Sequence, residues 1–317
     1  MSPGFEDRLA RRREQLRRQQ IRRRRLMVAS VAGVVVIAAA AIVLTRGSDD
    51  PPTQGRTAAT GAGNGGKQRA AGTTEADADT GAGTKSGAQP DETWKPSKAP
   101  VPILMYHVIG EPAGDVAYPD LYLSTDDFRA QVEWLSENGY TAVTLLQVQA
   151  AWYDGGTLPD KPVVLSFDDG YLGQYLDAMP ILSRAGWAGQ LNLKSEGSDL
   201  TTKQVKKMIR AGWEIASHTI THPDLRNISP EQLREELEGS KRRLERELGI
   251  EIVNFCYPAG MYNDEVIKAV EAAGYRGATT VNPGLGKRDM PFELNRIRID
   301  RGDGAEALSG KLASAGA

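Results

Sequence analysis

The chain has 317 residues, enough for about two domains of ordinary size, and a formal net charge of −2 from 39 Lys and Arg against 41 Asp and Glu. Ten of the arginines lie in residues 1–25 beside three acidic residues, which leaves 29 basic and 38 acidic residues, a net charge of −9, in residues 26–317. This distribution argues against a basic nucleic-acid-binding body, because the positive charge is confined to one end. The single cysteine, Cys256, excludes an intramolecular disulfide and a cysteine-cluster metal site, and only three histidines are available for catalysis or metal binding.

Residues 26–45 form an uncharged apolar stretch directly after the arginines. At a rise of about 1.5 Å per residue this stretch matches a hydrocarbon core of about 30 Å, so it predicts a single transmembrane anchor. Because arginines stay on the cytoplasmic side, we expect residues 1–25 in the cytoplasm and everything after residue 45 outside the membrane. A cleaved signal peptide is the alternative, although its apolar core is usually only about 7–15 residues long. A basic terminus that binds nucleic acid or anionic lipid is compatible with the anchor.

Residues 46–97 predict a disordered linker. From residue 46 to residue 93 there is no Val, Ile, Leu, Met, Phe, Trp or Tyr, and Gly, Ala and Thr dominate. Such a segment cannot bury enough apolar surface to offset the entropy of ordering it. A flexible coil of this length spans about 40 Å on average. Residues 304–317 predict a second flexible segment, a C-terminal tail, so the folded domain is expected at 98–303.

The segment 98–303 alternates apolar, β-rich runs with helical patterns. Ser124 caps a predicted helix that ends near residue 138, a capping box at 229–232 opens a helix to about residue 248, and Asn263 opens another. The strands lack strict alternation of polar and apolar residues, as expected when both faces of a sheet are covered. This order predicts an α/β fold with a parallel sheet, and eight strands favour an irregular, TIM-like (β/α) barrel, with a doubly wound open sheet as the alternative. The predicted strands are 101–107, 140–146, 163–168, 190–194, 213–218, 252–257, 277–281 and 296–300.

Polar side chains gather at the ends of these predicted strands. His107 ends the first strand, Asp168 and Asp169 end the third, His218 ends the fifth, and Asp300 ends the last. A barrel and an open parallel sheet both place the active site at the carboxyl ends of their strands. An Asp-Asp-Gly sequence alone is most often a turn, but so many reactive residues at one edge predict a catalytic site.

His218 and His222 give the strongest indication of a metal site. The three β-branched residues between them and the proline at 223 disfavour a helix, so we expect a strand that turns into a loop. Two His and one Asp form a common catalytic zinc set that leaves a fourth position open for water. Of Asp168 and Asp169, one would be the carboxylate ligand and the other would lie beside the metal-bound water as a general base.

Three motifs, taken in their order along the chain, resemble those of a known family. SFDDG at 166–170, SHTITHP at 217–223 and YPAG at 257–260 resemble motifs of the polysaccharide deacetylases, the NodB-homology or carbohydrate esterase family 4 domain, over about residues 102–300. The resemblance implies an irregular (β/α) barrel and metal-dependent N- or O-deacetylation of a glycan. It implies that Asp168 is the catalytic base, that Asp169, His218 and His222 bind the metal, and that the backbone N–H near Ala259 stabilises the oxyanion.

The sequence departs from the family pattern at the catalytic acid. The family usually takes this acid, a histidine, from the last strand, but residues 296–300 contain none. The first and last strands of a closed barrel are neighbours, so His107 can fill that position, with a buried structural imidazole as the alternative. The stretch 101–107 also resembles the N-terminal motif of the branch that acts on exported poly-N-acetylglucosamine, where the acid is displaced in this way.

The second departure is at Cys256, where many family members have an arginine that orients the base. A cysteine cannot make that charge-assisted contact. Strand alternation puts Arg296, Arg298 and Asp300 on one face, and we expect Arg298 to point inward and take over this role. Cys256 itself is expected to be a packing residue and not a nucleophile, because no further histidine is available to activate it.

Together these features predict a membrane-anchored, extracytoplasmic, metal-dependent deacetylase of N-acetylglucosamine-containing polysaccharide, either an exopolysaccharide or peptidoglycan. The metal is expected to be Zn²⁺, although Co²⁺ and Ni²⁺ suit the same ligands. The expected partners are the acetylated glycan and the membrane, with no nucleic acid. Three alternatives stay open: an O-acetyl esterase acting on a glycan, a metal-dependent amidase with a non-carbohydrate substrate, and a non-catalytic glycan-binding module.

Overall fold

The structure is a computed structural model, and it describes residues 90–317 apart from residue 113. The predicted cytoplasmic segment 1–25, the predicted transmembrane span 26–45 and most of the predicted linker lie outside these residues. Within the part of the chain that is described, no helix combines the length and the apolar character needed to cross a bilayer.

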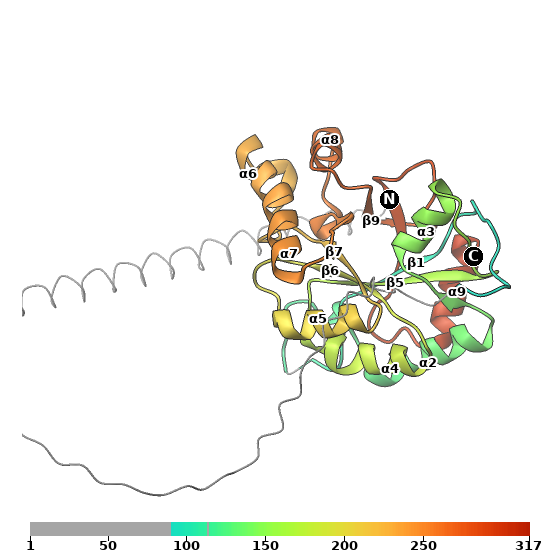
Figure 1. Cartoon of the computed structure of the whole chain (residues 1–317). Helices are drawn as coiled ribbons and strands as arrows, with labels where there is room; N and C mark the ends of the chain where they lie inside the picture. The colour runs from blue at the N-terminus through green and yellow to red at the C-terminus, as the bar shows by residue number, and fades with distance from the viewer. Residues whose placement is uncertain (1–89, 113) are drawn as a thin grey trace, which may run out of the picture. The chain divides into compact units, whose positions relative to one another are not determined.

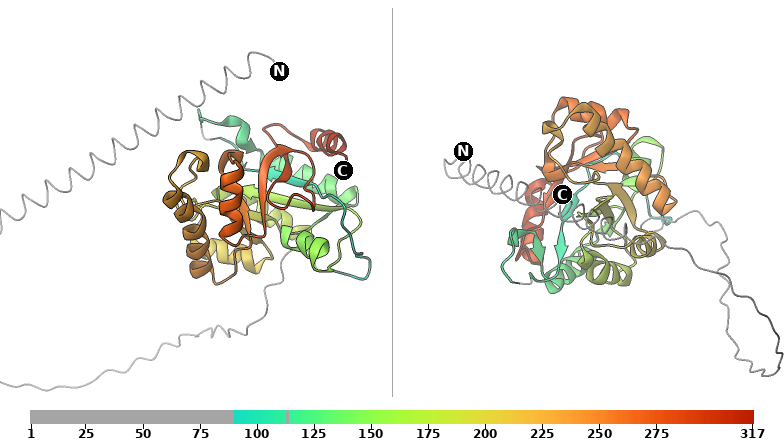
Figure 2. Two further views of the ribbon diagram at one scale, coloured as in Figure 1. Left: turned by 90° about the horizontal axis from the view of Figure 1, so that it is seen from above. Right: turned by 90° about the vertical axis from the view of Figure 1, so that its left-hand side faces the viewer.

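Parallel strands form a closed barrel with helices around its outside (Figures 1 and 2). The strands are β1 (Ile103–Tyr106), β2 (Val108–Ile109), β3 (Tyr122–Leu123), β4 (Thr141–Ala142), β5 (Pro162–Asp168), β6 (Gln190–Leu193), β7 (Glu214–Ser217), β8 (Asn254–Cys256), β9 (Gly277–Pro283) and β10 (Leu294–Arg298). The main sheet has the order β1-β10-β9-β8-β7-β6-β5-β4, and β1 also pairs with β5. Leu104 of β1 therefore has a parallel partner on each side, Ile297 in β10 and Leu165 in β5. This double pairing closes a ring of seven strands and excludes the doubly wound open sheet.

The second predicted strand, 140–146, does not join the ring. Only its residues 141 and 142 form β4, which pairs with Pro162 and Val163 at the beginning of β5. The chain then enters a helix at Leu145, because Thr144 and Gln147 form a capping box. The prediction of eight barrel strands was therefore wrong by one strand. Separately, β2 and β3 form a small two-stranded parallel sheet.

The helices begin at the capping residues that were predicted from the sequence. Ser124 Oγ accepts the Asp127 N–H at 2.9 Å, Ser229 forms the capping box with Gln232, and Asn263 Oδ1 accepts the Val266 N–H at 3.0 Å. The helix predicted from Ser229 runs as α6 and α7, joined by the π-helical turn η4. The α-helices are α2 (Thr125–Glu137), α3 (Leu145–Tyr153), α4 (Met179–Arg184), α5 (Thr202–Arg210), α6 (Pro230–Arg234), α7 (Ser240–Leu248), α8 (Asp264–Ala272) and α9 (Ala305–Ala315). The shorter turns are η1 (Pro119–Leu121), η2 (Gln174–Ala178), η3 (Leu225–Asn227), η4 (Glu235–Gly239) and η5 (Pro258–Gly260), of which η2 and η4 are π-helical.

The apolar core lies between the barrel and the helices. Phe167 of β5 stacks on Tyr106 of β1 at a centroid distance of 5.1 Å, and Phe128 of α2 meets both rings edge to face. Because side chains alternate along a strand, the neighbours of Phe167, Ser166 and Asp168, point into the barrel. The outward residues of β5 thus build the core, and its inward residues are free for polar chemistry.

The amino end of the barrel is closed by the beginning of α3. Glu214 of β7 accepts the Leu146 N–H at 2.9 Å and an Nδ2–H of Asn254 at 2.8 Å. Gln149 of α3 donates to Asn254 Oδ1 at 2.8 Å. Burial raises the pKa of Glu214 to about 7, although the hydrogen bonds from Asn254 and the α3 backbone oppose that shift.

The ordered domain begins before residue 98. Trp94 is buried in a cluster with Trp152 and Leu158. Lys95 and Leu158 exchange both backbone hydrogen bonds, at 2.9 and 2.8 Å. The last residues of the predicted linker therefore pack on the barrel, because Trp94 supplies the apolar surface that the rest of that linker lacks.

The predicted flexible tail 304–317 was wrong, because these residues contain helix α9. Leu308 and Leu312 are four residues apart, so they lie on one face of the helix, and both are buried. Lys311 donates to the carbonyl oxygen of Arg298 at 2.8 Å and forms an ion pair with Asp303. These contacts attach α9 to the end of β10, and α9 also packs on α2.

Candidate active site

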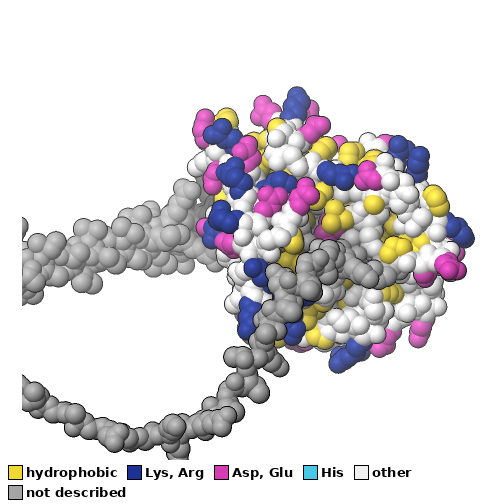
Figure 3. Space-filling view, viewed as in Figure 1, with side chains coloured by type: hydrophobic (Ala, Val, Ile, Leu, Met, Phe, Trp, Pro, Cys, Tyr) yellow, Lys and Arg dark blue, Asp and Glu magenta, His cyan; other side chains and the backbone are white. Residues whose placement is uncertain are grey.

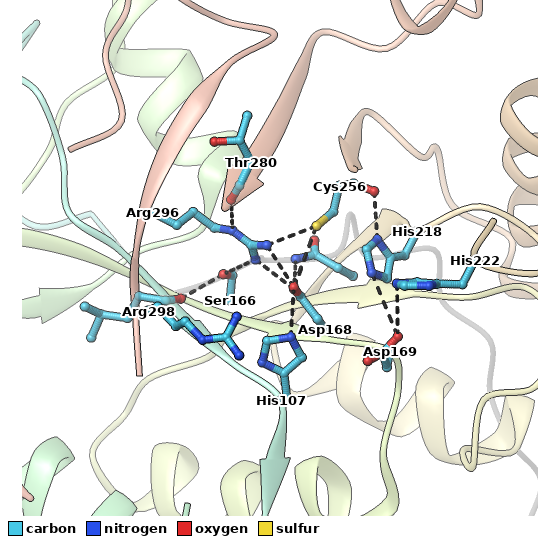
Figure 4. A network of polar contacts seen from close by, with 12 residues as sticks. His107, Ser166, Asp168, Asp169, His218, His222, Cys256, Thr280, Arg296 and Arg298 are labelled. Carbon is cyan, nitrogen blue, oxygen red and sulfur yellow. Dashed lines mark hydrogen bonds and ion pairs between the residues drawn. The ribbon is translucent and has the colours of Figure 1, made fainter. Parts of the chain in front are cut away.

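The predicted catalytic and metal-binding side chains meet at the carboxyl ends of the barrel strands (Figure 4). His107 follows β1, Asp168 ends β5 and Asp169 follows it, and His218 directly follows β7. The chain can turn sharply after Asp168 because the next residue is followed by Gly170, which has φ of +78°. A Cβ at Gly170 would lie 2.4 Å from Ser198 Oγ, so only glycine fits this turn.

Asp168 is paired with an arginine inside the barrel. Arg296 Nη1 and Nη2 donate to the two carboxylate oxygens of Asp168 at 2.7 and 2.8 Å, and Asn192 Nδ2 donates to Oδ1 at 2.7 Å. Arg296 also donates to the Thr280 carbonyl at 2.7 Å and to Cys256 Sγ at 3.3 Å. Burial would raise the pKa of Asp168, but the Arg296 charge and its hydrogen bonds outweigh burial and hold that pKa far below its usual range. The carboxylate is therefore ionised and fixed in orientation.

The prediction that Arg298 orients the base was wrong, because Arg296 makes that contact. Arg298 Nε donates to Asp300 at 2.7 Å, and both of these side chains are more than a third exposed. The alternation of side chains along the strand correctly put Arg296 and Arg298 on one face of β10. It did not indicate how deep in the barrel each of the two side chains lies. Two residues along a parallel strand span about 6.6 Å, so Arg298 lies nearer the mouth of the barrel and reaches solvent.

Asp169, His218 and His222 form a group that can hold a metal ion. Their ligand atoms all lie within 4.8 Å of one another, with Nε2 of His218 and of His222 at 3.9 and 3.7 Å from Asp169 Oδ1. His218 Nδ1 lies 2.7 Å from the Cys256 carbonyl oxygen. That contact puts a proton on Nδ1, so in the neutral ring Nε2 carries the lone pair that a metal would need. Two imidazoles and one carboxylate converging in this way fit a catalytic zinc site.

Asp168, His218 and Cys256 also lie close enough to hold an ion. This second group is a poor cation site, because both Asp168 oxygens and the Cys256 sulfur already contact the Arg296 guanidinium. In the group of Asp169, His218 and His222, a metal ion would compete with a weaker cation for the carboxylate. Lys194 Nζ lies 3.4 Å from Asp169 Oδ1 as a single point charge.

His107 lies on the other side of Asp168 from the metal-binding group (Figure 4). Its Nε2 is 3.7 Å from Asp168 Oδ2, and its buried Nδ1 has no hydrogen-bond partner among the residues that the structure describes. Burial lowers the pKa of His107, and the nearby Asp168 and Asp169 charges only partly offset this effect. The lowered pKa favours the neutral ring, so His107 must take up a proton before it can act as an acid.

Strained backbone is concentrated at this site. In the described part of the chain only four residues other than glycine have positive φ: Asp169 at +75°, Thr219 at +67°, His222 at +61° and Ala259 at +50°. Such conformations cost about 1–3 kcal/mol each and persist only where the surroundings enforce them. Ala259 lies in the turn η5, three residues after the Cys256 carbonyl that contacts His218. Three of these residues, Asp169, His222 and Ala259, were predicted from sequence to belong to the site, and Thr219 lies between the two predicted histidine ligands.

Several supporting side chains were missed by the sequence analysis. Asn192 lies near the end of β6 and Lys194 directly follows that strand, so the same strand-end argument that found His107 could have found them. Gln174 of η2 is fully buried, and its Nε2 donates to the carbonyl oxygens of His107 and Asp168, both at 2.7 Å. This bridge ties the ends of β1 and β5 together, and nothing in the local sequence around Gln174 indicates it.

Comparison with known proteins identifies the family. The family model for polysaccharide deacetylase matches residues 155–278. Over 228 residues the chain is 34% identical to the "Putative polysaccharide deacetylase YxkH" of Bacillus subtilis (strain 168), and the match covers 70% of this chain and 79% of that protein. The chain belongs to the polysaccharide deacetylase family.

Further matches agree with this assignment. The poly-beta-1,6-N-acetyl-D-glucosamine N-deacetylase of Escherichia coli (strain K12) is 38% identical over 84 residues, which are 26% of this chain but only 12% of that protein. The solved structure of the Streptococcus pyogenes deacetylase PplD in complex with acetate has a TM-score of 0.63 and 28% identity, and the match covers 68% of this chain and 99% of that one. The family predicted from the three motifs is thus confirmed. The proteins that match this chain include a member of the poly-N-acetylglucosamine branch, which was predicted from the motif at residues 101–107.

Proposed function

We propose that this polysaccharide deacetylase removes N-acetyl groups from an N-acetylglucosamine-containing polysaccharide, an exopolysaccharide or peptidoglycan, and that it needs a divalent metal. The observation that carries the proposal is the position of Asp168. This buried, ionised carboxylate has the group Asp169, His218 and His222 on one side and His107 on the other. The E. coli relative, named for its action on poly-N-acetylglucosamine, supports the substrate class.

Asp169, His218 and His222 would hold the metal, most plainly Zn²⁺, with Co²⁺ and Ni²⁺ as alternatives that the same ligands accept. A divalent metal bound there would act as a Lewis acid, lowering the pKa of water and polarising the acetyl carbonyl. The strained residues at 169 and 222 support this role, since the backbone keeps an unfavourable conformation to aim these two side chains at one point.

The chain's own residues would move the protons. Asp168 takes a proton from the attacking water while Arg296 and Asn192 hold the carboxylate in place. The water oxygen forms a bond to the acetyl carbon, and the Ala259 N–H donates to the oxygen that becomes negative. His107, whose Nε2 lies 3.7 Å from Asp168 Oδ2, receives that proton from Asp168 and gives it to the sugar nitrogen as the carbon–nitrogen bond breaks. The products are acetic acid and a sugar amine, which ionise to acetate and an ammonium group, so amide and water balance and both Asp168 and His107 return to their starting states.

The direct experiment measures acetate release by the full-length protein from N-acetylglucosamine oligomers and from peptidoglycan. The assay is run as isolated, after chelation and after return of Zn²⁺. We expect release that chelation abolishes and zinc restores. An O-acetylated glycan without N-acetyl groups serves as the matched substrate, and release from that substrate alone would identify an O-acetyl esterase.

Two variants assign the roles within the site. Asp168→Asn keeps the shape of the side chain but cannot accept a proton, and His107→Ala removes the donor. Each is expected to lower kcat by about 10²–10⁴-fold, the usual contribution of a general base or acid. Unchanged activity of His107→Ala would contradict the acid role. Folded, metal-loaded wild-type protein that binds glycans but releases no acetate would favour a binding module over an enzyme.

We also propose that residues 26–45 anchor the protein in a membrane, with residues 1–25 in the cytoplasm and the deacetylase domain outside. The uncharged stretch and the ten preceding arginines support this topology. Protease added to intact cells is expected to degrade the domain and to leave a membrane-bound N-terminal fragment. Recovery of the whole domain without a membrane-bound fragment would contradict the anchor.

A further inference from the structure

The loop that carries His222 is held by a side chain from outside the catalytic set. Glu236 lies in the π-helical turn η4, between α6 and α7. Its Oε2 accepts the backbone N–H groups of Ile220 and Thr221 at 2.8 and 3.0 Å, and its Oε1 accepts the Thr221 hydroxyl at 2.6 Å. One carboxylate thus binds three donors of the segment that joins His218 to His222.

This segment is strained, and besides Glu236 the backbone N–H groups of Ser195 and Glu196 hold it, donating to the Thr219 and Ile220 carbonyl oxygens at 3.0 and 3.1 Å. Thr219 and His222 both have positive φ, and Thr219 is β-branched, which makes that conformation especially unfavourable. Inside the loop, the His222 N–H donates to Thr219 Oγ1 at 3.0 Å. The N–H groups of Ile220 and Thr221, in contrast, point to Glu236. Without that carboxylate, the two amides lose their charge-assisted bonds and less opposes relaxation of the strained backbone.

The turn that carries Glu236 is itself fixed to the barrel. Ser240, four residues further on, contacts Ser217 at 2.6 Å through the two hydroxyl groups, and Ser217 directly precedes His218. A π-helical turn disturbs the regular backbone bonding, and here the Leu237 carbonyl accepts the Tyr275 hydroxyl at 2.9 Å. Such turns are rare and frequent at functional sites. Glu236 therefore contacts the middle of the loop, and Ser240, at the beginning of α7, contacts the residue that directly precedes it.

We infer that Glu236 is a positioning residue that sets the metal affinity of the polysaccharide deacetylase by holding the His218–His222 loop in its strained, ligand-presenting conformation. This inference rests on the proposed metal dependence. It makes no use of Glu236 as a ligand or as an acid, because its oxygens are occupied by the loop. Groups that orient ligands in this indirect way usually change metal affinity by about 10–100-fold when they are removed.

The test measures the dissociation constant of Zn²⁺ for the full-length protein by competition with a chromophoric chelator. Glu236→Ala is expected to raise that constant by about 10–100-fold. Glu238→Ala is the matched control. Glu238 lies in the same turn and pairs at 3.0 Å with Arg242, with both side chains more than a third exposed, on a surface where charges of both signs are mixed over α6 and α7 (Figure 3). That control is expected to leave zinc binding unchanged.

Two further measurements separate positioning from general stability. Hydrogen exchange at the amides of residues 220 and 221 should become faster in Glu236→Ala at a temperature where the barrel strands stay protected. Glu236→Gln can keep the geometry with an uncharged acceptor, so its zinc constant should rise less. Thr221→Val, which removes only the hydroxyl donor, should weaken zinc binding in the wild type and change nothing further in the Glu236→Ala background.

The outcomes are distinct. Tight zinc binding by wild type that Glu236→Ala leaves unchanged in a folded protein would overturn the positioning role and leave the proposed metal site intact. If Glu236→Ala does not fold, unchanged zinc constants for both Glu236→Gln and Thr221→Val would overturn it equally. Wild-type protein that binds no zinc, cobalt or nickel would overturn the proposed metal dependence and the positioning role together.

Discussion

Replacement of Arg296 by methionine tests the buried ion pair with Asp168, which fixes the orientation of the proposed base. The Arg296 side chain is fully buried and that of Asp168 is 4% exposed, and two charge-assisted hydrogen bonds of 2.7 and 2.8 Å join them. Unit charges about 4 Å apart attract by about 4 kcal/mol at an effective dielectric constant of about 20. Breaking a buried pair by removing one partner usually costs about 3–5 kcal/mol, because the other charge is left uncompensated.

We therefore expect Arg296→Met to lower the free energy of unfolding by about 3–5 kcal/mol and to lower kcat by about 10²-fold or more, because Asp168 loses its fixed orientation. Urea denaturation measures the first quantity and acetate release the second. Arg298→Met is the matched control on the same strand. Arg298 and its partner Asp300 are both more than a third exposed, so this change is expected to cost less than about 1 kcal/mol of stability.

The double variant Asp168→Asn with Arg296→Met decides whether charge is the cause. With both charges gone, no buried charge is left without a partner, so the double variant should be more stable than the sum of the two single losses predicts. Additive losses, or an Arg296→Met variant within about 1 kcal/mol of wild type, would refute the argument that this pair organises the site.

Three further predictions test other parts of the structure. Gln174→Ala should lower kcat by up to about 10²-fold and stability by about 2–4 kcal/mol, because two buried carbonyl groups lose their donor; urea denaturation and acetate release measure both effects. Burial raises the pKa of Glu214 from 4.5 to about 7, so its contribution to stability is present below pH 4.5 and is lost as the pH rises through 7. Between pH 5 and pH 8 the wild type should therefore lose about 2–3 kcal/mol relative to Glu214→Gln in urea denaturation, and a constant difference would contradict this pKa. Leu308→Ala should cost about 2–4 kcal/mol if α9 is part of the core, whereas a frayed tail would tolerate it.

The sequence allowed prediction of those parts of the fold that depend on local patterns. Apolar runs located the seven ring strands, and capping residues such as Ser124 and Asn263 located helix starts. The ends of the predicted strands were enough to place Asp168, Asp169 and His218 together at one edge of the sheet. These features follow from strand geometry and from hydrogen bonding within a few residues.

Features that depend on depth or on distant contacts could not be predicted in this way. Alternation gave the face of Arg296 and Arg298, but depth along the barrel decided which of the two reaches Asp168. The segment 304–317 is rich in Ala and Gly, so it was predicted to be flexible. The four-residue spacing of Leu308 and Leu312, which indicates a helix with one buried face, was overlooked because that face is buried only where α9 packs on the rest of the domain, including α2. Gln174 and Glu236 act through hydrogen bonds to segments that are distant in the sequence. The residues next to them in the sequence form no pattern that indicates these hydrogen bonds.

The ring is closed by the pairing of β1 with β10, and this pairing determines when the Asp168–Arg296 ion pair can form during synthesis of the chain. The Asp168–Arg296 pair joins positions 128 residues apart, and Arg296 lies in β10, which is synthesised after the other strands of the ring. Contacts so distant in sequence form late, since the entropy of closing the loop opposes them until the rest of the barrel is in place. Until then Asp168 has no counter-charge, and His107 has no last strand beside it. The ion pair that fixes Asp168 can therefore form only after β10 has been synthesised and has joined the barrel.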